Sequence, residues 1–96
     1  MAAATLSSDS IKERLARYVT IQEVDNVPIT AGLHSVGCSV PPTSTQEYID
    51  EQAELVVRTF VLAIKEKMIQ RVYKVQVDEM GVDHEGNKIY RTDVYM

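Results

Sequence analysis

The sequence predicts an α+β fold, in which an antiparallel sheet carries one long amphipathic helix on one of its faces. Two periodicities indicate this. Apolar residues recur every three or four positions in 45–70, as on one face of a helix, and alternate with polar residues in 27–40 and 73–96, as in half-buried strands. The length of 96 residues suits one core. We therefore expect a single domain over 1–96, with 1–9 as an N-terminal arm and elements in the order α-β-β-α-β-β.

A short helix is expected from residue 10 to residue 19. Ser10 followed by Glu13 fits a capping box, in which each residue's side chain bonds the other's backbone N–H at the helix start. The apolar residues that follow share one helix face: Ile11, Leu15, Tyr18 and Val19. A helix this short depends on tertiary packing for its stability.

The segment 20–40 is expected to contain two strands. The pair Asp25-Asn26 is a turn signal between two runs of residues that favour strands. In the second run, the alternation of apolar and polar residues shifts by one position at His34-Ser35. Such a shift predicts a β-bulge or a bend at that point.

A helix over residues 45–70 is the best-supported element. Ser44 and Glu47 fit a second capping box, and the acidic first turns and basic last turn both suit the helix dipole. The apolar face is broad, because it includes residues that are adjacent in sequence. It comprises Ile49, Ala53, Val56, Val57, Phe60, Val61, Ile64 and Met68.

The C-terminal segment 73–96 is expected to form a β-hairpin around a polar turn at 81–88. Apolar and polar residues alternate on both sides of this turn. The apolar positions are Tyr73, Val75 and Val77 before it, and Tyr90, Val94 and Met96 after it.

Charge and composition argue against several classes of protein. A formal charge of −4 disfavours general binding to nucleic acid or to anionic membranes. A single cysteine, Cys38, cannot form a disulfide within the chain. The sequence contains neither a secretory signal nor a run of about 18 apolar residues that could span a bilayer. We therefore expect a soluble protein of the cytoplasm or another intracellular compartment.

No group of residues predicts catalysis or a cofactor. His34 and Cys38 are the nearest to a base and a nucleophile, but four positions along one strand separate them by about 13 Å. The acidic segment 78–85 has the composition of a calcium loop, yet Gly81 and Thr92 fall where that loop needs carboxylates. A polar hairpin turn is the better explanation, with a divalent metal as the open alternative. We expect a non-enzymatic protein with no metal site.

One local basic patch is a candidate site for an anionic partner. It comprises Lys65, Lys67, Arg71 and Lys74, with Tyr73 among them. Cations at the end of a helix also complement the helix dipole, which is a purely structural explanation. The patch supports an alternative function as a small nucleic-acid- or ligand-binding module, although the overall charge disfavours nucleic acid.

Self-association is the leading functional hypothesis. A helix of the expected length, roughly 38 Å, exceeds strands of five or six residues, so part of its apolar face needs a further partner. The strand 88–96 is a second candidate surface, because few charges would protect it at a sheet edge. The expected interface residues are Val56, Val61, Met68, Tyr90, Val94, Tyr95 and Met96. We therefore expect a structural or interaction subunit of a homo-oligomeric assembly, or a subunit that binds another protein. A virion or phage particle is one natural setting.

Overall fold

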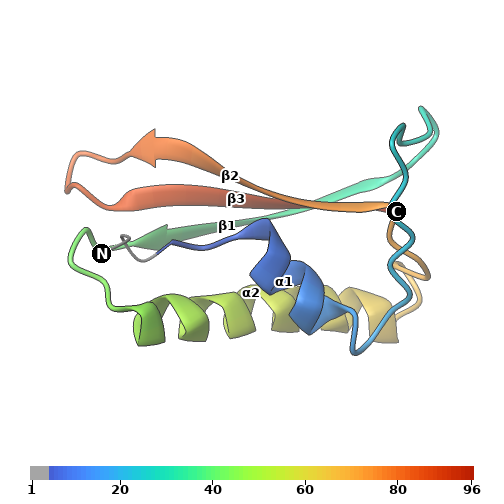
Figure 1. The fold of residues 1–96 in the computed structure, drawn as a ribbon, viewed down its shortest axis with the longest axis horizontal. Helices are drawn as coiled ribbons and strands as arrows, with labels where there is room; N and C mark the ends of the chain where they lie inside the picture. The colour runs from blue at the N-terminus through green and yellow to red at the C-terminus, as the bar shows by residue number, and fades with distance from the viewer. Residues whose placement is uncertain (1–4) are drawn as a thin grey trace.

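A computed structural model of the chain describes residues 5–96 and shows a three-stranded antiparallel sheet with two helices below it (Figure 1). The elements are α1 (Ser8–Leu15), β1 (Leu33–Val40), α2 (Gln46–Lys65), β2 (Lys74–Val82) and β3 (Lys88–Tyr95). The predicted α+β class is confirmed, as is the long helix across one face. The order α-β-α-β-β has one strand fewer than expected.

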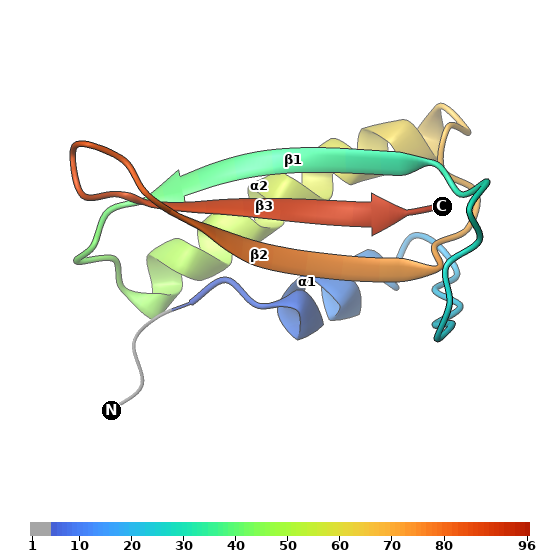
Figure 2. The same ribbon diagram turned by 90° about the horizontal axis from the view of Figure 1, so that it is seen from above.

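The sheet has the strand order β1-β3-β2, and all neighbours are antiparallel (Figure 2). β2 and β3 form the predicted hairpin, and β1 pairs with the other side of β3. The β1–β3 register runs without interruption from Leu33↔Tyr95 to Val40↔Lys88. The C-terminal strand therefore lies in the centre of the sheet. The expectation that it offers an open edge was wrong, because β1 and β2 occupy both of its sides.

The segment 20–32 forms no strand of the sheet, although two strands were expected over 20–40. Its one sheet-like contact is a parallel bridge between Ile21 and Val72, with hydrogen bonds of 2.7 Å and 3.0 Å from Gln22 N to Val72 O and from Val72 N to Thr20 O. Ile29 is fully exposed, so the apolar residues of this segment do not form the buried face of a further strand.

The expected bulge at His34-Ser35 is absent, because β1 begins only at Leu33 and keeps a regular register with β3. His34 lies on the face of the sheet that the helices cover. Its ring meets the ring of Phe60 edge-on, with 5.5 Å between centroids. A histidine thus takes an inward position where the sequence pattern suggested a break in the strand.

α1 begins and ends earlier than expected. Ser7, rather than Ser10, is the N-cap, and its Oγ accepts a hydrogen bond of 3.2 Å from the Ser10 N–H. Ile11 and Leu15 are fully buried, and they attach the helix to the core. The Arg14 guanidinium binds two carboxylates of α2, Asp50 and Glu54.

α2 begins one residue later than expected and ends at Lys65. Its N-cap is Thr45, whose Oγ1 accepts a hydrogen bond of 3.1 Å from the Tyr48 N–H, while the Ser44 hydroxyl donates to Pro41 O. Lys67 has a φ of 63°, and this left-handed residue ends the helical path. The prediction that the helix continues to residue 70 was therefore wrong.

The core lies between the sheet and the two helices, with Phe60 at 0% exposure among its members. The predicted apolar face of α2 is buried from Ile49 to Val61, whereas Ile64 is half-buried and Met68 is exposed beyond the helix end. In the part of the chain that the structure describes, no helix is both long enough and apolar enough to cross a membrane.

Candidate interaction surface

The free edge of β1 follows from its pairing with β3. Gly32 and Met96 exchange both of their backbone hydrogen bonds, at 2.8 Å and 3.0 Å. In an antiparallel pair, such doubly bonded positions alternate with positions that do not bond each other. The N–H and C=O groups that point away from β3, toward the free edge, are therefore those of Leu33, Ser35, Gly37 and Ser39.

This edge has none of the usual protection against pairing with another strand. Natural edge strands carry charges, prolines or bulges that discourage such pairing. β1 has eight residues, LHSVGCSV, with no proline and no Asp, Glu, Lys or Arg. Its register with β3 also contains no shift. β1 is therefore a long, regular and uncharged template for a further strand.

The opposite edge, β2, is protected. It carries Lys74, Asp78 and Glu79, and its register with β3 shifts between Glu79 and Val82. The Val77 N–H, which points outward, donates a hydrogen bond of 2.9 Å to Ser8 Oγ in the first turn of α1. The start of α1 thus lies against part of the β2 edge, and within residues 5–96 only β1 keeps an unprotected edge.

α2 carries an exposed apolar stripe on the side of the helix that is turned away from the sheet. Tyr48, Leu55 and Leu62 are 37%, 50% and 60% exposed, and their spacing of seven residues places them along one side of the helix. We call these three residues the outer stripe. Asp50 and Glu54, which bind Arg14, mark the side of α2 that faces α1.

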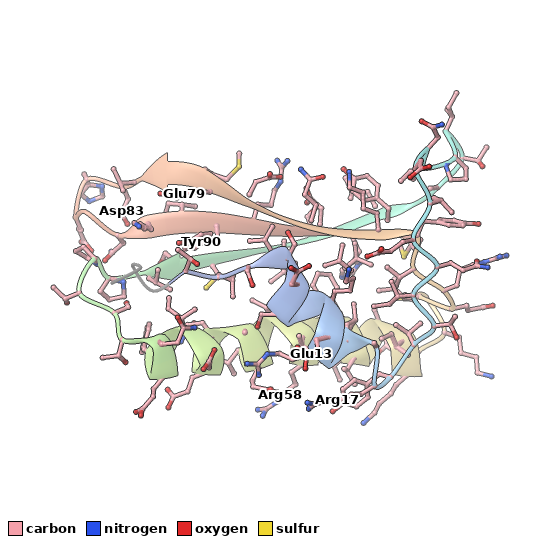
Figure 3. The ribbon with its side chains drawn as sticks, viewed as in Figure 1. Glu13, Arg17, Arg58, Glu79, Asp83 and Tyr90 are labelled. Carbon is pink, nitrogen blue, oxygen red and sulfur yellow. The ribbon has the colours of Figure 1, made fainter. Side chains whose placement is uncertain are left out.

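The position of Gln52 shows which side the outer stripe occupies. Gln52 Oε1 lies 3.8 Å from the Cys38 Sγ, so this side chain reaches the underside of β1. On a helix, Leu55 is rotated by about 60° from Gln52, away from the buried residues and toward Arg58, which lies on the side of the helices away from the sheet (Figure 3). The outer stripe therefore faces away from the sheet, and it is a separate surface from the free edge of β1.

The face of the sheet opposite the helices is polar and lacks a covering element among residues 5–96 (Figure 3). Its centre holds Asp93, which is 1% exposed. The Ser35 hydroxyl donates to Asp93 Oδ1 at 2.6 Å, and Arg91 Nε donates to Oδ2 at 3.2 Å. Both carboxylate oxygens are thus satisfied, which accounts for a buried charge at this position. Above Gly37 there is open space.

The predicted basic patch does not converge on one site. Lys65, Lys67, Arg71 and Lys74 each line a different surface groove. The guanidinium of Arg71 lies over the ring of Tyr73, 5.6 Å from its centroid. Among residues 5–96, none of the four cations forms a salt bridge. The patch is therefore a dispersed positive surface rather than a pocket.

The interface residues expected from sequence are mostly inside the molecule. Val56, Val61, Tyr90 and Val94 belong to the core, where they pack within the chain. Met68 is exposed in the turn after α2. Tyr95 and Met96 are half-buried, and Met96 lies beside Gly32. The expected contact surface is thus largely unavailable to a second molecule.

Cys38 and His34 both face the helix side of the sheet, but each has a structural environment of its own. Burial raises the pKa of the Cys38 thiol, so it stays protonated near neutral pH and is a weak nucleophile. The thiol contacts Gln52, whereas His34 contacts Phe60. The structure does not bring the two side chains into a catalytic pair.

The acidic segment forms a hairpin turn organised by Asp83, at the end of the sheet (Figure 3). Asp83 Oδ1 accepts hydrogen bonds of 2.9 Å from the Glu85 and Asn87 N–H groups, and Oδ2 accepts one from Asn87 Nδ2. Desolvation raises the pKa of Asp83, but these hydrogen bonds outweigh it and leave the pKa below its ordinary value. Over the described range 5–96, no three His, Cys, Asp or Glu side chains are placed to hold a metal ion.

Sequence reasoning missed both the outer stripe and the unprotected edge of β1. The seven-residue spacing of Tyr48, Leu55 and Leu62, outside the main apolar face, was the available signal for the outer stripe. The lack of charge in 33–40 was the signal for an unprotected strand, but the sequence did not show which strand lies at an edge. Comparisons with protein family models, with curated proteins and with solved structures found no match to this chain.

Proposed function

We propose that this chain is a non-enzymatic structural or interaction subunit that self-associates into a homo-oligomeric assembly. The observation that carries this proposal is β1, an eight-residue edge strand without charge, proline or register shift. Unpaired backbone groups on such an edge bind another strand readily, which natural proteins prevent unless the pairing serves a purpose. The β2 edge of the same sheet is protected, so the lack of protection is confined to β1.

The outer stripe of α2 supports the same function. Three large apolar side chains in one row on the exposed side of α2 are a second surface that an associating molecule would cover. Backbone pairing then supplies direction and register, while apolar burial supplies affinity. A virion or phage particle is the setting that we propose by analogy with other small assembly subunits.

The test is the molar mass of the chain in solution, measured by multi-angle light scattering across the micromolar range. The proposal expects a mass that is a multiple of 10.8 kDa, or that rises toward one with concentration. A mass of 10.8 kDa at every concentration would contradict it. Truncation after Asp93 is unsuitable as a probe, because it removes the fully buried Val94 from the central strand.

The alternative function, a nucleic-acid- or ligand-binding module, depends on the basic patch. What supports it is that Lys65, Lys67, Arg71 and Lys74 form no salt bridge within residues 5–96. The four cations line different grooves, which argues against a single site for a small ligand. Binding to a single-stranded oligonucleotide that weakens steeply with added salt would favour this alternative.

A further inference from the structure

We propose that the partner of β1 is the β1 strand of a second copy, paired antiparallel about a two-fold axis at Val36. The two three-stranded sheets then join into one sheet of six strands. This inference rests on the proposed self-association and specifies its interface. Closed two-fold symmetry needs one self-complementary surface, and the free edge of β1 meets that requirement.

The self-complementarity lies in the hydrogen-bond register of this edge. The groups directed to the free edge are those of Leu33, Ser35, Gly37 and Ser39. In an antiparallel pair centred at Val36, Leu33 faces Ser39 of the second copy, and Ser35 faces Gly37 of the second copy. Every outward N–H and C=O of these four residues then has a partner. A pairing displaced by two residues leaves one of the four without a partner, so the centre at Val36 is favoured.

Pairing between β1 and the β2 edge of another copy fits the structure less well. Such a head-to-tail contact would propagate into a filament, since it leaves a free edge at each end. The Val77–Ser8 hydrogen bond, the charges of β2 and its register shift all oppose an incoming strand. The surfaces therefore favour a closed dimer over an open chain.

The test is site-specific cross-linking of single cysteines in the Cys38→Ser background. Gly37→Cys places a thiol on the open face of β1, where a Cβ meets no atom within 4 Å. In the proposed dimer the two introduced side chains lie diagonally across the β1–β1 pair, about 8 Å apart. Asp78→Cys is the matched control, because Asp78 and Gly37 both pair with Arg91 on that face. In the six-stranded sheet, five strand spacings separate Asp78 of one copy from Asp78 of the other, which is roughly 24 Å.

A short bismaleimide should convert Gly37→Cys to a covalent dimer with roughly ten times the yield of Asp78→Cys, because only the former pair is within its reach. Circular dichroism checks that both variants are folded. Equal yields, or a higher yield for Asp78→Cys, would overturn the interface. No cross-linking of either variant, with an oligomer still present by light scattering, would overturn the interface but leave self-association standing. A monomer by light scattering would overturn both proposals.

Discussion

Thr92 offers a stability test whose sign is set by the structure. It lies in the centre of β3, fully buried, with Val36 and Val77 opposite it on the neighbouring strands. Its Oγ1 has no hydrogen-bond partner among residues 5–96. A buried hydroxyl without a partner costs about 1–3 kcal/mol in proteins. Because valine keeps the branched shape and removes the hydroxyl, Thr92→Val should raise the free energy of unfolding by about that amount.

Urea unfolding followed by circular dichroism measures this change. For a domain of this size, the free energy of unfolding falls by about 1 kcal/mol per molar urea, so the midpoint should rise by about 1 M or more. Ser35→Ala is the control of opposite sign, because it removes the hydroxyl that donates to the buried Asp93. Its midpoint should fall, since a hydrogen bond to a charged group contributes about 1.5–3 kcal/mol. An unchanged or lower midpoint for Thr92→Val would refute the placement of this hydroxyl among apolar groups.

Three further predictions concern the core, the thiol and the turn. Phe60→Ala should lower the free energy of unfolding by about 3–5 kcal/mol, because the ring is fully buried; a loss below about 1 kcal/mol would contradict its place in the core. Cys38→Ala should leave the solution mass unchanged, and the native thiol should react slowly with an aromatic disulfide reagent at neutral pH, because its pKa is raised; fast reaction in the folded chain would contradict this. The Asp83 pKa is lowered on folding, so its contribution to stability is present at neutral pH and disappears as the pH falls through the folded pKa. Asp83→Asn should therefore lose less stability than the wild type between pH 5 and about pH 2, and an identical acid profile would argue against the turn hydrogen bonds.

The helices were largely predictable because their signals are local. The apolar spacing of α2 identified its buried face from Ile49 to Val61, and the structure confirms that face. The ends were less accurate. Thr45 rather than Ser44 caps the helix, and Lys67 in a left-handed conformation ends it early. Several polar residues in a row can each serve as a cap, so tertiary contacts decide among them.

Strand order was not predictable, because it depends on contacts between distant parts of the chain. The hairpin β2–β3 is local and was found. The pairing of β1 with the far side of β3 joins residues more than 45 positions apart, and no periodicity indicates it. This pairing placed β3 in the centre, which removed the expected interface along 88–96 and exposed the edge of β1 instead.

The candidate site was only partly visible in the sequence for the same reason. A broad apolar helix correctly suggested more surface than one sheet covers, but α1 covers part of it, through Ile11 and Leu15. The exposed apolar residues are Leu55 and Leu62 instead, outside the main periodicity. Their place on the side of α2 away from the sheet depends on how α2 packs, which only the fold reveals.

The most direct test of self-association through β1 is the solution mass of Gly37→Pro, measured by sedimentation equilibrium beside the wild type and Glu79→Pro. The Gly37 N–H points to the free edge, so proline there removes no hydrogen bond within the chain but blocks an incoming strand. Glu79→Pro makes the matching change on the β2 edge, because Tyr90, its partner in β3, bonds to β1 instead. The wild type and Glu79→Pro should share the mass of a dimer, and Gly37→Pro should give 10.8 kDa. An assembled Gly37→Pro with the wild-type mass would contradict the account.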